Sequence, residues 1–277
     1  MPPLVSGVSA AVPGAPGMRP LIGSSWKMHL TPSQVDAYLR TLLGLVADVA
    51  DRDLFVLPAF PALQAARDRL TGSNVAWGAQ DVHPADEGAH TGDVSAPMLA
   101  DLGCRYVMVG HAERRRDHGE TYEMAAAKVS AVVRAGMVPI ICLGETTPTG
   151  PNEATAQVLA DLDRALKELV PGELPDVVIA YEPGWAIGAG MVAAPPADIG
   201  TIHRDIHDWL AGRGFGPGRA RVIYGGSVDT PVARELLCQP GVDGLFVGRA
   251  SLDPERFAAI CRTPAPWSAT TRVPATA

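Results

Sequence analysis

The sequence has few cysteines, no excess of basic residues and no long apolar run, and each absence excludes a class of protein. Its four cysteines form no Cys-x-x-Cys pair, which argues against a disulfide framework or a zinc-site spacing and favours a reducing compartment, the cytoplasm. The formal net charge of −7 gives no reason to expect nucleic acid or an anionic membrane as partner. No stretch approaches the roughly 18 apolar residues of a membrane span.

The two ends of the chain contain little that could fold. Residues 1–18 are small and proline-containing, without the basic start and apolar block of a signal peptide, and we expect a disordered leader there. Residues 263–277 are rich in Pro, Thr and Ala, which predicts a flexible tail. The chain is 47% apolar and 19% charged, as in globular proteins. Residues 19–262 therefore form the expected folded unit, of a size that suits one α/β barrel.

Between the ends, short apolar runs alternate with longer amphipathic ones. Apolar residues follow the helical i, i+3, i+4, i+7 rule over residues 35–46 and again over residues 158–169. Thr31-Pro32 suits a helix N-cap followed by proline at the first helical position. The expected strands are Leu21–Ser25, Leu54–Leu57, Val75–Gly78, Tyr106–Gly110, Val138–Leu143, Val177–Tyr181, Arg221–Tyr224 and Gly244–Val247.

Strict alternation of eight strands with helices predicts an α/β fold, a single-domain (β/α)8 barrel. Each strand needs a helical crossover to reach the next, so the strands pair in parallel. A doubly wound open sheet is the alternative, but no Gly-x-Gly-x-x-Gly follows the first strand and no P-loop sequence occurs. In a barrel, active sites lie at the carboxyl ends of the strands.

Polar residues do follow the ends of five expected strands. Any one of them has a plain structural explanation, because a lone lysine or histidine is more often a solvated or core residue than a catalytic one. Their joint position at one end of a barrel predicts an active site instead. They are Ser25-Trp26-Lys27, Gly110–Arg115, Tyr181–Gly190, Tyr224–Ser227 and Gly248–Ser251.

These and other stretches, in this order, resemble the triosephosphate isomerase family over nearly all of residues 19–262. The resemblance implies a TIM barrel that isomerises a small phosphorylated sugar from ketose to aldose, in glycolysis and gluconeogenesis, without a metal or other cofactor. The matching stretches are Ser25-Trp26-Lys27-Met28, Gly78–Val82, Thr91–Ser95, Val109–Arg115, Cys142-Leu143-Gly144-Glu145, Ala180–Pro183, Trp185–Gly188 and Tyr224–Val228.

The resemblance also implies a role for each catalytic residue. Glu182 would be the base that removes a proton beside the substrate carbonyl. His111 would polarise the oxygens as a neutral imidazole, its pKa depressed by a helix N-terminus, an effect for which this family is itself the standard example. Lys27 would supply positive charge to the phosphate and the enediolate. Glu113 would neutralise and orient Lys27.

Phosphate binding and a closing lid follow from the same resemblance. Ser25, Gly188, Ser227, Gly248 and Arg249 would bind substrate or phosphate, although the glycines could also simply form tight turns. In the lid, Trp185 would donate to Glu145 in the open state and Tyr224 would receive the closed lid; a core tryptophan is the alternative. The lid comprises Pro183, Gly184, Trp185, Ala186, Ile187, Gly188, Ala189 and Gly190.

Four positions depart from the family pattern. Ser25 stands where the family usually has asparagine, Ala112 replaces a serine, Gly184 a valine and Arg249 a glycine. Ser25 and the Gly248-Arg249 pair also resemble a side branch that isomerises four-carbon erythrulose phosphates, so that substrate stays open. A catalytically silent barrel that only binds a phosphometabolite is a third possibility, although such a protein would have no need for the whole catalytic set.

Residues 80–93 are long for a loop between strand and helix. They match the loop that the family inserts into a neighbouring subunit, with Thr91 reaching toward the partner's site. The resemblance therefore implies a symmetric homodimer formed through the 80–93 loop.

Overall fold

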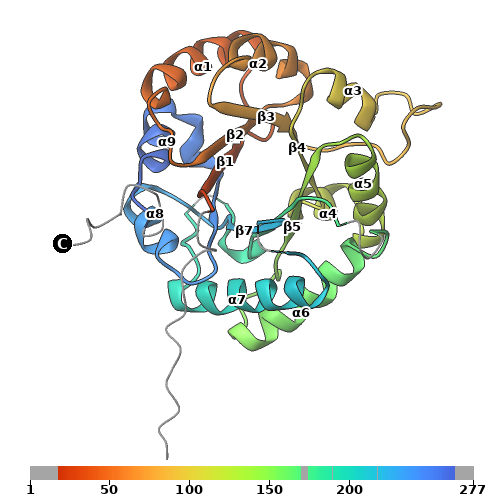
Figure 1. Ribbon diagram of the computed structural model, residues 1–277, viewed down its shortest axis with the longest axis vertical. Helices are drawn as coiled ribbons and strands as arrows, with labels where there is room; N and C mark the ends of the chain where they lie inside the picture. The colour runs from red at the N-terminus through yellow and green to blue at the C-terminus, as the bar shows by residue number, and fades with distance from the viewer. Residues whose placement is uncertain (1–17, 170–173, 189, 217, 266–277) are drawn as a thin grey trace, which may run out of the picture.

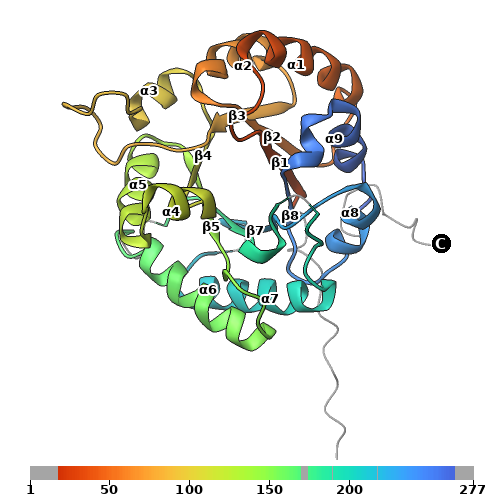
Figure 2. The same cartoon turned by 180° about the vertical axis from the view of Figure 1, so that it is seen from behind.

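Eight parallel strands close into a barrel, in the order β1 to β8, inside a ring of helices (Figures 1 and 2). This computed structural model describes residues 18–169, 174–188, 190–216 and 218–265. Closure is direct, because Leu21 to Ser24 of β1 pair with Gly244 to Val247 of β8. The barrel prediction is confirmed, and the doubly wound alternative is wrong.

The strands begin and end within one residue of the positions expected from the sequence. Apart from β3, in which Ala76 and Trp77 are half-buried, each is an almost continuous run of buried residues, as expected for strands covered by helices. Their bounds are β1 Leu21–Ser25, β2 Asp53–Leu57, β3 Val75–Ala79, β4 Tyr106–Val109, β5 Val138–Leu143, β6 Val177–Tyr181, β7 Ala220–Tyr224 and β8 Gly244–Val247.

The helices connect successive strands and cover the outside of the barrel. They are α1 Pro32–Val46, α2 Leu63–Leu70, α3 Ala96–Asp101, α4 Ala112–His118, α5 Tyr122–Arg134, α6 Pro151–Ala165, α7 Pro196–Gly212, α8 Thr230–Leu237 and α9 Pro254–Cys261, with 3₁₀ turns η1 Phe60–Ala62, η2 Gly184–Ala186 and η3 Arg249–Leu252. None of the helices in the described residues is long and apolar enough to cross a membrane.

Two helix predictions can be compared with these bounds. Thr31 is the N-cap of α1 as expected, and its N–H donates to Gln34 Oε1 at 2.8 Å. The periodic run 158–169 outlasts its helix, since α6 ends at Ala165. Beyond that point Leu169 N–H bonds to the carbonyl of Leu166, a tighter turn that still keeps Leu166 buried.

The core has an inner layer within the barrel and an outer layer between strands and helices. Gly23 shows how tightly the inner layer is packed, because a Cβ there would lie 2.0 Å from the Phe55 ring. The filled interior leaves only the ends of the barrel for a site. The inner layer consists of Leu21, Phe55, Leu57, Tyr106, Met108, Ile140, Cys142, Val178, Ala180, Ile223 and Phe246.

The start of the expected tail packs against the barrel. Thr263 and Ala265 are buried, and the carbonyl of Thr263 accepts a hydrogen bond from Arg52 Nη1 at 2.6 Å. The buried guanidinium of Arg52 thereby gains a polar partner, which it needs away from water. The remainder of the tail, and the leader apart from Met18, lie outside the described residues.

Candidate active site

A cavity of about 390 Å³ opens at the carboxyl ends of the strands. All of the expected catalytic and phosphate-binding residues line it: Ser25, Lys27, His111, Glu113, Glu182, Gly188, Ser227, Gly248 and Arg249. Five strand ends thus contribute to one space, although their residues are far apart in the chain. Of the expected lid, Ile187 and Gly188 line the cavity, and Ala189 lies outside the described residues.

Glu182 is placed directly after β6, where the barrel core meets the cavity. Its N–H donates to the carbonyl of Leu143 at 2.7 Å, which fixes the backbone. The residue is only 7% exposed, and among the described residues Oε2 has no hydrogen-bond partner. Gly225 makes this position possible, since a Cβ there would lie 2.6 Å from Glu182 Cγ. A buried carboxylate oxygen is therefore free to accept a proton.

His111 is the N-cap of α4, and this position determines its tautomer. Nδ1 accepts the Glu113 N–H at 3.2 Å, so in the neutral ring the proton is on Nε2. Nε2 lies 3.7 Å from Glu182 Oε2. Burial lowers the pKa of His111, and the charge of Lys27 lowers it further, against the opposing effect of Glu182. The ring is thus a neutral donor directed at the same space as Glu182.

Lys27 directs its amine into the cavity from a strained backbone. Its φ of 51° lies in the left-handed region, which is unusual for a residue other than glycine. Gln80 holds this conformation, because its Nε2 donates to the carbonyls of Lys27 and Leu57, each at 2.9 Å. Lys27 Nζ donates to Glu113 Oε1 at 2.6 Å, the contact that the family resemblance implied.

The charge of Lys27 is matched by Glu113. Burial alone would raise the pKa of Glu113, but the hydrogen bond and the charge of Lys27 lower it. Glu113 is thereby kept ionised beside the amine. Its own backbone N–H holds His111, so one residue of α4 positions both neighbours.

The loops after β7 and β8 form the other side of the cavity. Ser227 has a φ of 49°, a second strained residue at the site, and its Oγ donates to the carbonyl of Ala186 at 2.6 Å. Arg249 is exposed at the rim, and among the described residues it has no carboxylate within 4 Å. Nearby on the rim, Arg256 pairs with Asp229.

The turn η2 is attached to the barrel through Glu145. Trp185 Nε1 donates to Glu145 Oε1 at 2.8 Å, the open-state pairing expected from the resemblance. The hydroxyl of Tyr181 lies 3.2 Å from both carboxylate oxygens of Glu145, and Gly184 N–H donates to its carbonyl at 2.8 Å. The indole is half-buried, and it packs against the outer core while its N–H is hydrogen-bonded. Tyr224 OH accepts the N–H of Ala194 at 2.9 Å, where this segment rejoins the barrel.

Sequence reasoning gave no catalytic or binding role to three residues that build the site. Gln80 could have been found, because it follows the end of β3 on the same face as the other site residues. Gly225 was expected only to form a tight turn, whereas the absence of its side chain makes room for Glu182, since a Cβ there would lie 2.6 Å from Glu182 Cγ. Glu120, in the turn before α5, accepts the N–H of Gly110 at 3.0 Å and so fixes the residue before His111. No local pattern indicates that contact.

Comparison with known proteins agrees with this geometry. A family model described as triosephosphate isomerase matches residues 20–264. The chain is 44% identical over 248 residues to a triosephosphate isomerase of Thermus thermophilus, covering 88% of this chain and 98% of the relative. It is 42% identical to one of Chloroflexus aurantiacus, with 86% and 96% covered. A crystal structure of triosephosphate isomerase from Bartonella henselae superimposes with a TM-score of 0.77 at 34% identity, covering 88% and 98% of the two chains.

Proposed function

The chain belongs to the triosephosphate isomerase family, and from this premise we propose that it interconverts dihydroxyacetone phosphate and glyceraldehyde 3-phosphate. One observation carries the proposal: the amine of Lys27, the imidazole of His111 and the carboxylate of Glu182 line a single cavity. Moving a carbonyl by one carbon requires a base beside the carbon and donors beside both oxygens. These three groups supply that set.

The chemistry is a proton transfer between adjacent carbons. Glu182 Oε2 removes the proton from the carbon beside the carbonyl, and the electron pair forms the enediolate. The same carboxylic acid returns the proton to the neighbouring carbon, while a proton moves between the two oxygens. A positioned general base commonly contributes about 10²–10⁴-fold. Its unbonded, buried oxygen suits Glu182 to this role.

His111 and Lys27 stabilise the charge that develops on oxygen. The Nε2–H of a neutral imidazole donates a hydrogen bond to an enediolate oxygen. The lowered pKa of His111 keeps the ring in this neutral form. Lys27, oriented by Glu113, adds a fixed positive charge. Removing one such preorganised group typically costs about 3–4 kcal/mol of transition-state stabilisation.

Backbone N–H groups of Gly188, Ser227, Gly248 and Arg249 would bind the phosphate. The left-handed φ of Ser227 and the absence of a side chain at Gly248 allow the chain to approach an anion closely. The Arg249 guanidinium, free of any described carboxylate, would add charge at the rim. Strained backbone at both Lys27 and Ser227 is typical of a binding site.

Residues 183–190 would form a lid that closes over bound substrate. Trp185 would leave Glu145 on closing, and the Ser227 Oγ contact with Ala186 couples the lid to the phosphate loop. Closure would keep water from the enediolate, which otherwise loses its phosphate. Gly184 at the first hinge allows the backbone more conformations in the open state, and this conformational entropy is lost when the lid closes.

A four-carbon substrate is the second candidate, and Ser25 is the observation that favours it. Its side chain is shorter than the asparagine usual at that position and lines the cavity. The space it leaves would suit a ketose phosphate longer by one hydroxymethine, such as erythrulose 1-phosphate.

One assay separates these proposals. We would measure kcat/KM of the purified chain on dihydroxyacetone phosphate and on erythrulose 1-phosphate. A higher value on the triose supports the proposed function, and a much higher value on the tetrulose would transfer the assignment to the side branch. Absence of turnover on both, with phosphate-ester binding retained, would indicate a silent binding barrel.

We further propose that the protein acts in the cytoplasm as a homodimer, in glycolysis and gluconeogenesis. The 80–93 loop projects from the barrel between β3 and α3, where a neighbouring subunit could receive it (Figures 1 and 2). Gln80 at its start also holds Lys27, so docking of the loop would act on the site. Analytical ultracentrifugation at micromolar concentration tests this, and a fully active monomer would contradict it.

A further inference from the structure

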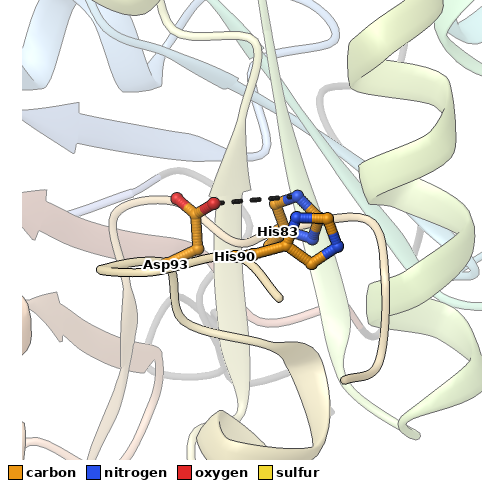
Figure 3. Close-up of side chains that lie close together, drawn as sticks. All are labelled: His83, His90 and Asp93. Atoms are coloured by element: carbon orange, nitrogen blue, oxygen red, sulfur yellow. Dashed lines mark ion pairs between the residues drawn. The ribbon is translucent and has the colours of Figure 1, made fainter. Parts of the chain in front are cut away.

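A second cavity, of about 260 Å³, opens at the amino ends of the strands, which is the end of the barrel opposite to the catalytic residues. The 80–93 loop leaves the other end, after β3, and the side chains of His83, His90 and Asp93 gather within it (Figure 3). A homodimer formed through that loop would therefore leave the amino ends open to solvent. None of the described residues that line the second cavity lines the catalytic one.

The alternation of side chains along a strand explains why charged residues face this cavity. Several inner-layer residues near the amino ends point toward the barrel axis: Leu21, Phe55, Val178 and Ile223. Because successive side chains of a strand point to opposite faces, the residues two positions earlier point toward the axis as well. Those residues line the cavity, and all are charged: Arg19, Asp53, Asp176 and Arg221.

The cavity carries an excess of positive charge, although the chain as a whole has a net charge of −7. Its described lining contains four arginines and two aspartates, which leaves an excess of two positive charges. Asp53 is shared by two of the arginines, since Arg221 Nη1 lies 2.6 Å from its Oδ2 and Arg19 Nε lies 3.4 Å from its Oδ1. Arg219 Nη1 pairs with Asp176 Oδ1 at 3.1 Å.

Arg105 is the arginine that these carboxylates leave unpaired. Its side chain is exposed, and its guanidinium carbon lies 5.4 Å from the centroid of the Tyr106 ring. No carboxylate among the described residues lies within 4 Å of it. Its backbone is fixed between two strands, because its N–H donates to the carbonyl of Trp77 at 2.8 Å and its carbonyl accepts the N–H of Val138 at 2.9 Å. A free cation thus stands on a rigid part of the barrel.

We propose that this cavity binds a phosphate dianion, either inorganic phosphate or the phosphoryl group of a small monoester. Such a group carries about 1.5–2 negative charges at pH 7, which the two excess positive charges would balance. Guanidinium groups suit it, because each can donate two parallel N–H bonds to phosphate oxygens. Residues 1–18 and 266–277 contain no aspartate or glutamate, so neither end of the chain offers a side-chain anion in its place.

A bound phosphate would join strand starts that are far apart in the chain. Arg19 precedes β1, Arg105 precedes β4, and Arg219 and Arg221 lie at the beginning of β7. In such barrels the amino end commonly serves stability rather than catalysis. Phosphate that binds only the folded chain raises the melting temperature as its concentration rises. Because the contact is electrostatic and open to solvent, it should weaken as NaCl is added.

The test is calorimetric titration of the full chain with inorganic phosphate and with glycerol 2-phosphate at low ionic strength. The catalytic cavity could also take up phosphate, so the chain is compared with an Arg105→Gln/Arg219→Gln variant, in which the excess of positive charge is removed. We expect binding at the second cavity to weaken by at least about 10–100-fold, since a hydrogen bond to a charged group contributes that much. An Arg40→Gln/Arg67→Gln variant removes two exposed arginines of α1 and α2 and is the charge-matched control.

The Nε–H signals of the arginines in ¹⁵N NMR locate the bound ion. The Arg105 signal, assigned by its loss in Arg105→Gln, should shift on adding phosphate. The kcat and KM of the double variant should be unchanged, because both arginines lie at the far end of the barrel from the catalytic cavity, so this test does not depend on the proposed reaction.

Equal phosphate binding by the chain and the Arg105→Gln/Arg219→Gln variant would overturn the proposal. An Arg105 signal that does not move at phosphate concentrations that saturate the calorimetric binding would also overturn it, because the ion would then occupy another site. Tighter binding of glycerol 2-phosphate would identify a monoester as the ligand, and equal or tighter binding of inorganic phosphate would identify the free ion.

Discussion

Glu182 and Glu120 are both buried carboxylates of the same barrel, but their surroundings are opposite. Glu120 is 4% exposed, and both of its oxygens are bonded: Oε1 to Gly110 N–H at 3.0 Å, and Oε2 to Lys128 Nζ at 2.7 Å and Arg114 Nε at 3.1 Å. Glu182 is 7% exposed, yet its Oε2 has no bond within the described residues. A carboxylate whose two oxygens are both hydrogen-bonded stabilises the fold. A carboxylate with an oxygen that has no hydrogen bond is available for reaction.

The difference extends to the regions around them. Glu120 belongs to an ion cluster behind β4, in which Lys128 also pairs with Asp81 at 2.7 Å. Burial alone would raise the pKa of Glu120, but the hydrogen bond and charge of Lys128 lower it, so the group stays ionised. Around Glu182 lie the neutral His111, whose Nε2 is 3.7 Å from Oε2, and the buried thiol of Cys142. The ion cluster thus fixes the backbone before His111 through the bond from Gly110 to Glu120. The carboxylate of Glu182, on the cavity side, remains available for reaction.

The largest expected effect is at Glu182. Glu182→Gln should lower kcat by about 10²–10⁴-fold, because the amide cannot accept the proton. The melting temperature should change little, since glutamine keeps the size of the side chain and Oε2 has no hydrogen bond within the described residues. Steady-state kinetics and thermal unfolding on the same sample measure both quantities.

Glu182→Asp is the matched control for that experiment. It keeps the charge but withdraws the carboxylate by about one methylene, and a misplacement of about 1 Å can cost about 10²-fold. If the glutamine variant turned over at the rate of the unmodified chain, Glu182 would not be the base and the contrast with Glu120 would have no catalytic meaning.

The second effect is on stability rather than on the reaction. Glu120→Gln should reduce the free energy of unfolding by about 3 kcal/mol, the lower end for a broken buried ion pair, because Lys128 keeps Asp81. For a chain of this size that corresponds to a melting temperature lower by about 6–12 °C. At temperatures where the variant is folded, turnover should persist. A large loss of kcat with unchanged melting would show that the two carboxylates are not functionally distinct.

The third-largest expected effect is the pH dependence of stability, which comes from two buried histidines. Burial lowers the pKa of His203 to about 3, and burial also lowers the pKa of His111. Both therefore fold neutral, and their contribution to stability is fully present above about pH 6.5. As the pH falls below 6.5, these histidines bind protons in the unfolded chain but not in the folded chain. The free energy of unfolding therefore decreases by up to about 1.4 kcal/mol per pH unit for each histidine.

Denaturant unfolding between pH 7.5 and pH 5 measures that slope, and His203→Gln should reduce it without altering kcat. In ¹⁵N NMR, His111 should retain the Nε2–H tautomer at pH 6. An imidazolium signal for His111 at that pH would contradict the proposed neutral donor.

The parts of this comparison differ in how well the sequence predicts them. The barrel follows from eight apolar runs in alternation with amphipathic ones, because each run is long enough to be a buried strand. Lys27, His111 and Glu182 follow from their position after strands, supported by the family resemblance. These features depend on local patterns, which a single sequence displays directly.

The supporting contacts depend on distances that no local pattern encodes. Glu120 meets Gly110 across a helix, and Gly225 accommodates Glu182 from the neighbouring strand. The unbonded state of Glu182 Oε2 is likewise a property of packing. The end of α6 was also missed, because Leu166 continues the apolar pattern after the helix has ended at Ala165.

The smallest expected effect is at Gln80, which contacts no substrate in the proposed reaction. The experiment tests whether Gln80 positions Lys27. Gln80→Ala removes two hydrogen bonds, including the one that holds the carbonyl of Lys27 in its left-handed conformation. We expect kcat/KM to fall by about tenfold, because each bond contributes about 0.5–1.5 kcal/mol and only part of that reaches the amine. Gln239→Ala is the matched control, since that half-buried side chain donates to the backbone carbonyl of Glu235 near the end of α8, away from the cavity, and activity should be unchanged. A merely structural role for Gln80 would lower the melting temperature and leave kcat and KM intact, whereas a positioning role changes the kinetic constants of the folded enzyme.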